Sequence, residues 1–262
     1  MWFLWKEEVL SPFFFVGWIL IFIASCAPSN QKEIVQKKEK VDLTVEDIVP
    51  LEMLDISSDR KKAFNKIARF NGKTYKKPIQ YYIHDETGYI NLEELLPSAN
   101  NYASEISDDV EQFIVDTFDY IDSYIDLDFQ RVYSPKKATI GIFLTSPPES
   151  FGAWTQFYYQ IKPYDYKIQI AWHKEGSAIY PKLKNYPTLP YSYAYLILHE
   201  IGHALGLSHG EEWGTIDPLD KRIEIRDTIM SYNDGGYRGE EISLSEFDIT
   251  ALQAIWGVEK DN

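Results

Sequence analysis

One short stretch, His199–His209, constrains the fold of this chain more than any other. It reads H-E-I-G-H-A-L-G-L-S-H. Residues four apart lie on the same face of a helix, so His199 and His203 can present two imidazole nitrogens to one ion. Gly206 can take the left-handed conformation that ends a helix and turns the chain back, which would bring His209 to the same ion. The stretch therefore predicts a helix, a tight turn and a metal site made of three imidazoles.

The same stretch carries a carboxylate, Glu200, beside the first histidine. This carboxylate need not bind the metal, because it can accept a proton from a water molecule whose pKa a zinc ion lowers to about 7. Three protein ligands leave a fourth position open, which is typical of a catalytic rather than a structural zinc site. The extended spacing is far more specific than H-E-x-x-H alone. It predicts one catalytic Zn²⁺ with Glu200 as general base; a zinc site without catalysis is the alternative.

A second segment, Asp227–Tyr232, reads D-T-I-M-S-Y and follows the third histidine. With the histidine stretch, it resembles the Met-turn of the metzincin zinc metalloproteases. The resemblance implies that Met230 lies beneath the histidines as an apolar floor, a role that suits a thioether. It also implies that Tyr232 reaches the zinc or the developing oxyanion, as in the serralysin and astacin branches. The alternatives are an ordinary core methionine and a plain packed tyrosine.

A third segment, Leu244–Gly257, resembles the closing helix of matrixins and serralysins. Its own residues predict a helix, because Ser245 and Asp248 have the spacing of a capping box and Gly257 can stop the helix. The chain also departs from these families. No cysteine is placed to silence the zinc, and Gly210 stands where a serralysin would have proline. The branch, serralysin-like or matrixin-like, therefore stays open, and the isolated His84 and His173 are predicted to be ordinary strand or loop residues.

The pattern of apolar residues predicts an α/β fold of the α+β zincin-like kind. A mixed twisted sheet, a long helix and the zinc-binding helix would form an upper subdomain. A small irregular lower subdomain would contain the Met-turn and the closing helix. The predicted strands are 79–83, 128–133, 139–144, 151–160 and 167–172. The predicted helices are 60–70, 100–125 and one that begins near Pro190.

The substrate cleft of such a fold lies under an edge strand, which pairs with an extended peptide. Residues 151–160 are the candidate edge; the alternative is a surface hairpin that contacts no substrate. The pocket for the side chain after the scissile bond is expected to be walled by Asn233–Ser243. The expected partner is therefore a peptide or protein substrate in an extended conformation.

The N-terminus has an apolar run, Ser11–Ala24, directly before Cys26, the only cysteine. The run is short for a bilayer span but suits the core of a signal peptide. The small residues before Cys26 read as a bacterial lipobox, which implies a lipid on Cys26 and a place in the cell envelope, facing the periplasm or the exterior. The net negative start is atypical. An uncleaved membrane anchor and an ordinary signal peptide are therefore the alternatives.

The predicted organisation has four parts: a lipoprotein signal peptide at 1–25, a flexible tether at 26–50, a helical N-terminal extension at 51–74 and a metzincin-like catalytic domain at 75–262. The tether is predicted from polar composition with little to bury. The extension is expected to pack on the outside of the domain, or to be the remnant of a pro-segment. With the single thiol consumed by lipid, no disulfide is expected.

The formal net charge of −14 does not favour nucleic-acid binding. It indicates a solvated acidic surface, or a surface that attracts basic or calcium-bearing partners. Ca²⁺ is possible, but no D-x-D-x-D-G loop places it. The sequence thus predicts a monomeric zinc-dependent endopeptidase, tethered to the bacterial envelope. The alternatives are a binding or adhesion lipoprotein on a non-catalytic zincin scaffold and an envelope-processing enzyme with a single partner.

Overall fold

The computed structural model describes residues 41–55, 58, 61–62, 65, 77–89, 102–145, 153–159, 166–173, 181–209, 220, 222–233 and 239–260. All of them belong to one compact unit, Lys38–Asn262. The predicted signal peptide, Cys26 with its lipid, and the tether up to residue 40 lie outside the described residues. Among the residues described, no helix combines the length and the apolar character that crossing a bilayer requires.

A seven-stranded mixed sheet lies at the centre of the unit. Strands β1, β4, β5 and β7 pair in parallel, whereas β6 runs antiparallel to β7 and β3 antiparallel to β5. The mixed sheet and its helices confirm the α/β class. All five predicted strands are present, and β2 and β3 are additional. The strands are β1 (Ile79–Ile83), β2 (Gly88–Tyr89), β3 (Tyr102–Ser104), β4 (Phe129–Arg131), β5 (Ile140–Thr145), β6 (Ala153–Tyr159) and β7 (Tyr166–His173).

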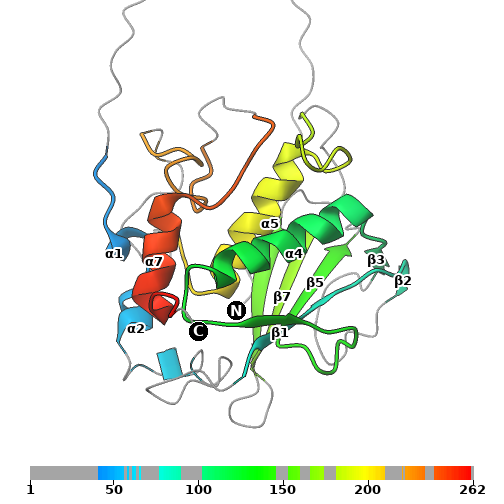
Figure 1. The fold of residues 1–262 in the computed structure, drawn as a ribbon, viewed down its shortest axis with the longest axis horizontal. Helices are drawn as coiled ribbons and strands as arrows, with labels where there is room; N and C mark the ends of the chain where they lie inside the picture. The colour runs from blue at the N-terminus through cyan, green and yellow to red at the C-terminus, as the bar shows by residue number, and fades with distance from the viewer. Residues whose placement is uncertain are drawn as a thin grey trace, which may run out of the picture. The chain divides into compact units, whose positions relative to one another are not determined.

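Strand β6 is an edge of the described sheet. It pairs along its whole length with β7, from Ala153 opposite Trp172 to Tyr159 opposite Tyr166, and with no other described strand. Both β6 and β7 contact helix α5 (Tyr191–Ala204), the helix that carries the histidine stretch. Figure 1 shows α5 in yellow, next to α4. The predicted edge at 151–160 is therefore an edge, and it lies beside the predicted metal-binding helix.

Helix α4 (Asp108–Asp122) is shorter than the predicted helix at 100–125. The prediction was wrong over its first residues, because Tyr102–Ser104 form β3 and pair with β2 and β5. Tyr102 and Ile106 fit a helical spacing only by coincidence. The helix begins after Ser107, whose extended backbone is followed by three acidic residues in the first turn, where the helix dipole favours negative charge. Its end comes before Ile125, which bridges to Val258 instead.

The core includes side chains from the sheet and from helices α4 and α5. The Phe118 ring of α4 stacks on Tyr81 of β1 with 4.2 Å between ring centroids. Helix α5 begins after Pro190, as predicted, and most of its residues are buried. Tyr82, the next residue of β1, points to the opposite face of the sheet. It shares a hydrogen bond of 3.0 Å with His84, whose ring packs on Phe143. His84 is thus an ordinary residue at the end of a strand, as expected, and His173 ends β7.

The N-terminal segment belongs to the folded unit. Helices α1 (Val45–Ile48) and α2 (Leu51–Leu54) contact α7 (Glu246–Trp256), as the blue and red ribbons in Figure 1 show. Ile48, Val49 and Met53 are fully buried. The predicted tether at 26–50 therefore reaches too far, and the folded unit begins well before residue 75. Apolar residues at 48, 49 and 53 provide enough surface to bury, which the polar composition of the preceding stretch concealed.

The predicted helix at 60–70 is described only at Lys61, Lys62 and Asn65, which are helical. Lys61 is buried, its Nζ donates to the carbonyl of Ile255 at 2.5 Å, and it lies 4.1 Å from the centroid of the Trp256 ring. Burial lowers the pKa of Lys61 to about 8. This part of the extension thus packs against α7. The closing helix itself has the predicted capping box between Ser245 and Asp248, and it ends at Gly257 with a positive φ of 94°.

Candidate metal centre

The three predicted ligands, His199, His203 and His209, come together. Their candidate ligand atoms all lie within 4.8 Å of one another. Helix α5 supplies the first two from one face. It ends at Ala204, and Gly206 takes the predicted positive φ, 105°, to turn the chain back. A Cβ on Gly206 would lie 2.7 Å from the Cε at the end of the Met53 side chain, which would have to shift.

Hydrogen bonds orient two of the three imidazoles. His199 Nδ1 lies 2.8 Å from the carbonyl of Ile229, and His203 Nδ1 lies 3.0 Å from the carbonyl of Leu207. A carbonyl can only accept, so each Nδ1 carries the proton and each Nε2 keeps its lone pair for a metal. Burial, with the neighbouring His203, holds the pKa of His199 well below its usual value. The His199 ring is therefore held in the neutral form that binds metal.

Glu200, which directly follows His199 in α5, is buried. The residue is 4% exposed, and its Oε2 has no hydrogen-bond partner among the described residues. Burial raises the pKa of Glu200 to about 7, and the Thr155 hydroxyl opposes that shift. The same hydroxyl donates to the main-chain carbonyl of Glu200 at 2.9 Å, which ties α5 to the edge strand β6. A buried carboxylate oxygen without a hydrogen-bond partner, in the residue that follows His199, fits a metal with its water.

Met230 packs against α5, the helix that carries the first two histidines. It is 1% exposed, and its Sδ would be 3.1 Å from a Cβ on Gly202. Gly202 is a variable position of the histidine motif and was not singled out from the sequence. Its missing side chain lets the thioether approach α5 between His199 and His203 in sequence. The sulfur therefore forms an apolar contact with the metal-binding helix.

Tyr232 also lies at the cluster. Its hydroxyl is 2.6 Å from His209 Nε2, its ring centroid is 5.4 Å from that of His199, and the residue is 47% exposed. The hydroxyl thus occupies the side of His209 from which a metal would be bound. A tyrosine in this place is able to exchange between the imidazole and a ligand in the site.

A buried carboxylate joins the closing helix to the Met-turn. Asp248 is fully buried and accepts from the hydroxyl of Thr228 at 2.6 Å, the main-chain N–H of Ile229 at 3.0 Å and the main-chain N–H of Ser245 at 2.9 Å. Burial raises the pKa of Asp248, and these hydrogen bonds oppose the shift. Because Ile229 in turn accepts from His199, the network reaches a metal ligand. Sequence reasoning identified Asp248 only as a helix cap.

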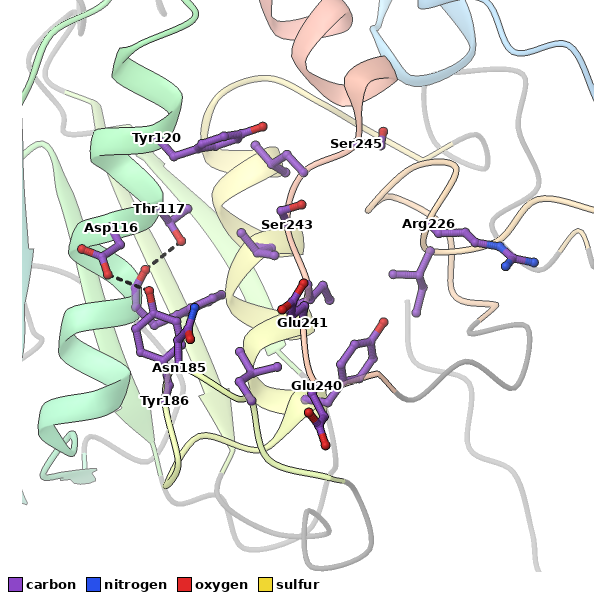
Figure 2. Close-up of a pocket in the computed structure, with 17 residues that line it drawn as sticks. Asp116, Thr117, Tyr120, Asn185, Tyr186, Arg226, Glu240, Glu241, Ser243 and Ser245 are labelled. Carbon is purple, nitrogen blue, oxygen red and sulfur yellow. Dashed lines mark hydrogen bonds between the residues drawn. The ribbon is translucent and has the colours of Figure 1, made fainter.

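A cavity of about 670 Å³ adjoins the site without including its histidines. Helix α4 and residues 240–245 form two of its walls, and Tyr191 and Leu198 of α5 also line it; Leu198 directly precedes His199. Three carboxylates line the cavity, those of Asp116, Glu240 and Glu241, against the single guanidinium of Arg226, which points away from them in Figure 2. Part of the predicted pocket wall at 233–243 thus lines this cavity, while residues 234–238 lie outside the described residues.

No family model matches the chain, and no curated protein matches it. The site has three imidazoles that converge, a buried carboxyl group in the residue after His199 and an adjacent edge strand among the described strands.

Proposed function

We propose that this protein is a zinc-dependent endopeptidase of the metzincin type. The observation that carries the proposal is the convergence of His199, His203 and His209 beside the buried, unpartnered Oε2 of Glu200. Three imidazoles with an open fourth position suit zinc better than the hard, oxygen-seeking cations. The Met230 support and the Tyr232 hydroxyl at His209 favour the same family.

The chain's own groups divide the work of hydrolysis. Zinc, when bound by the three imidazoles, polarises the scissile carbonyl and the attacking water. Glu200 accepts the proton of that water and later donates it to the leaving amine. Tyr232 moves from His209 to donate a hydrogen bond to the oxygen that becomes negative.

The edge strand β6 is the proposed substrate-binding strand. Its free side offers main-chain groups to an extended peptide, which would add a further strand to the sheet. Thr155 of β6 is hydrogen-bonded to the carbonyl of Glu200, so a peptide bound along β6 lies next to the general base. The proposed substrate is therefore an extended segment of a peptide or protein, cleaved by a monomeric enzyme.

The proposed location is the bacterial cell envelope, with a lipid on Cys26 as anchor. An adhesion lipoprotein on an inactive zincin scaffold is the rival function. A binding protein gains nothing from a buried carboxylate oxygen without a hydrogen-bond partner, because such an oxygen costs stability. The Glu200 geometry therefore favours the enzyme.

We expect the soluble chain from Ala27 onward to bind one zinc ion and to cleave a quenched peptide library. A chelator should abolish the cleavage, and added Zn²⁺ should restore it, because the imidazoles alone cannot activate water. Metal content and hydrolysis would be measured on the same sample. Stoichiometric zinc without turnover on any peptide would favour the adhesion lipoprotein or an enzyme with a single partner.

The same library should show a preference for Lys or Arg near the scissile bond. The reason is the cavity beside Leu198, which three carboxylates line, whereas its one lining guanidinium, that of Arg226, points away from them. Replacing Glu240 and Glu241 together by Gln should weaken that preference about tenfold, a difference of about 1.4 kcal/mol. Glu246→Gln, a neutralisation on the exposed start of α7, is the matched control. An unchanged cleavage profile in the double variant would show that the cavity does not select the substrate.

A further inference from the structure

Tyr195 connects the metal-binding helix to the turn that carries Tyr232. It lies one helical turn before His199, on the same face of α5. Its hydroxyl donates to the main-chain carbonyl of Ser231 at 2.8 Å and lies 3.5 Å from His199 Nδ1. The closer of the two contacts is the one to Ser231. Tyr195 therefore joins two segments that lie 36 residues apart in sequence.

The carbonyl that Tyr195 holds belongs to the peptide plane from which Tyr232 extends. The Ser231 carbonyl and the Tyr232 N–H form one rigid peptide unit, so fixing the carbonyl fixes the orientation of the Tyr232 backbone. The Ser231 side chain is held independently, because its Oγ donates to the carbonyl of Ile223 at 3.0 Å and accepts from the N–H of Asn233 at 3.1 Å. The main-chain carbonyl of Ser231 is held by the Tyr195 hydroxyl.

We propose that Tyr195 is a positioning residue of this site, which holds the Tyr232 hydroxyl at His209 through the carbonyl of Ser231. Tyr232 is 47% exposed, so packing of its own ring restrains it only in part. Its hydroxyl nevertheless lies 2.6 Å from His209 Nε2. The backbone supplies the missing restraint. The kinetic consequence rests on the proposed function, whereas the geometric consequence does not.

The geometric consequence is tested with Tyr195→Phe in the metal-free protein. Nitrogen-15 NMR of the His209 imidazole reports the Tyr232 hydrogen bond, and Tyr232→Phe gives the chemical shift of Nε2 without it. We expect Tyr195→Phe to move the His209 Nε2 shift most of the way to that reference. Tyr193→Phe, on the opposite side of the same helix, is the control and should leave the shift unchanged. A wild-type shift in Tyr195→Phe would overturn the proposal.

The kinetic consequence is tested in the zinc-loaded full chain. We expect kcat to fall about tenfold in Tyr195→Phe while KM and zinc affinity stay within a fewfold of wild type, because only the placement of one donor is lost. The double variant with Tyr232→Phe should be no slower than Tyr232→Phe alone. Additive losses would overturn the proposal. So would a loss of zinc affinity, which would place the role of Tyr195 at His199.

The two arms separate the inference from the proposed function. If the wild-type protein cleaves no peptide, the proposed function fails, but the His209 spectra still decide whether Tyr195 holds Tyr232. If cleavage occurs and the spectra of Tyr195→Phe match wild type, the inference fails and the peptidase stands.

Discussion

Glu200→Gln is expected to lower kcat/KM for peptide cleavage by about 10²- to 10⁴-fold and to leave zinc binding intact. Glutamine keeps the shape of the side chain but cannot accept a proton. The orienting hydrogen bonds of His199 and His203 go to main-chain carbonyls, so the substitution removes none of them. Catalysis and metal binding should therefore separate in this variant.

The measurement pairs steady-state hydrolysis of the best library peptide with metal content of the same preparation. Glu105→Gln neutralises an exposed carboxylate and should behave as wild type. Activity retained in Glu200→Gln would exclude a general base at this position. Loss of zinc together with activity would instead show that Glu200 is needed to hold the metal.

Asp248→Asn is expected to lower the free energy of unfolding by about 2–4 kcal/mol. The carboxylate accepts hydrogen bonds from Thr228, Ile229 and Ser245 in a site without solvent. An amide replaces one acceptor oxygen with a donor, which would face N–H or O–H groups and leave them unsatisfied. Since Ile229 orients His199, zinc affinity should also fall, by about tenfold.

Urea denaturation with a chelator present measures the stability change apart from the metal, and a competition titration measures zinc affinity. Asp126→Asn is the matched control. Asp126 forms an ion pair with Lys260, whose side chain is 69% exposed, and losing such a pair should cost about 1 kcal/mol or less. Equal unfolding midpoints for Asp248→Asn and wild type would contradict the role given to this network.

The local parts of the site were predictable from sequence because their physics is local. His199 and His203 share a helix face through their spacing, Gly206 turns the chain through its missing side chain, and the capping box of the closing helix spans four residues. Each requires only a short segment and its intrinsic geometry. The strands followed in the same way from their β-branched and aromatic residues.

The contacts that hold these parts together were not predictable. Tyr195 and Ser231, or Ile229 and Asp248, meet only after the whole unit has folded, and one tyrosine among nineteen carries no mark of its role. Gly202 looks like a variable position until Met230 is placed against it. The β3 strand was missed because Tyr102 happens to fit a helical spacing, while the pairing that decides its conformation comes from β5, some forty residues later.

The N-terminal segment was missed for a related reason. Ile48 accepts a hydrogen bond from the N–H of Ser208, one residue before the third histidine, at 2.8 Å. The fully buried Met53 fills the space beside Gly206. Neither contact can be recognised from the N-terminal segment alone, because Ser208 and Gly206 lie far from it in sequence.

This docking would limit where the proposed enzyme is able to work. With the proposed lipid on Cys26, the chain has only the stretch up to Thr44 before it enters the folded unit, which spans at most roughly 60–65 Å when fully extended. The largest distance between the proposed active site and the bilayer would then be set by the length of that stretch and by the size of the folded unit. Substrates would have to come close to the bilayer, so proximity to the membrane becomes a second filter on what is cleaved, separate from any pocket.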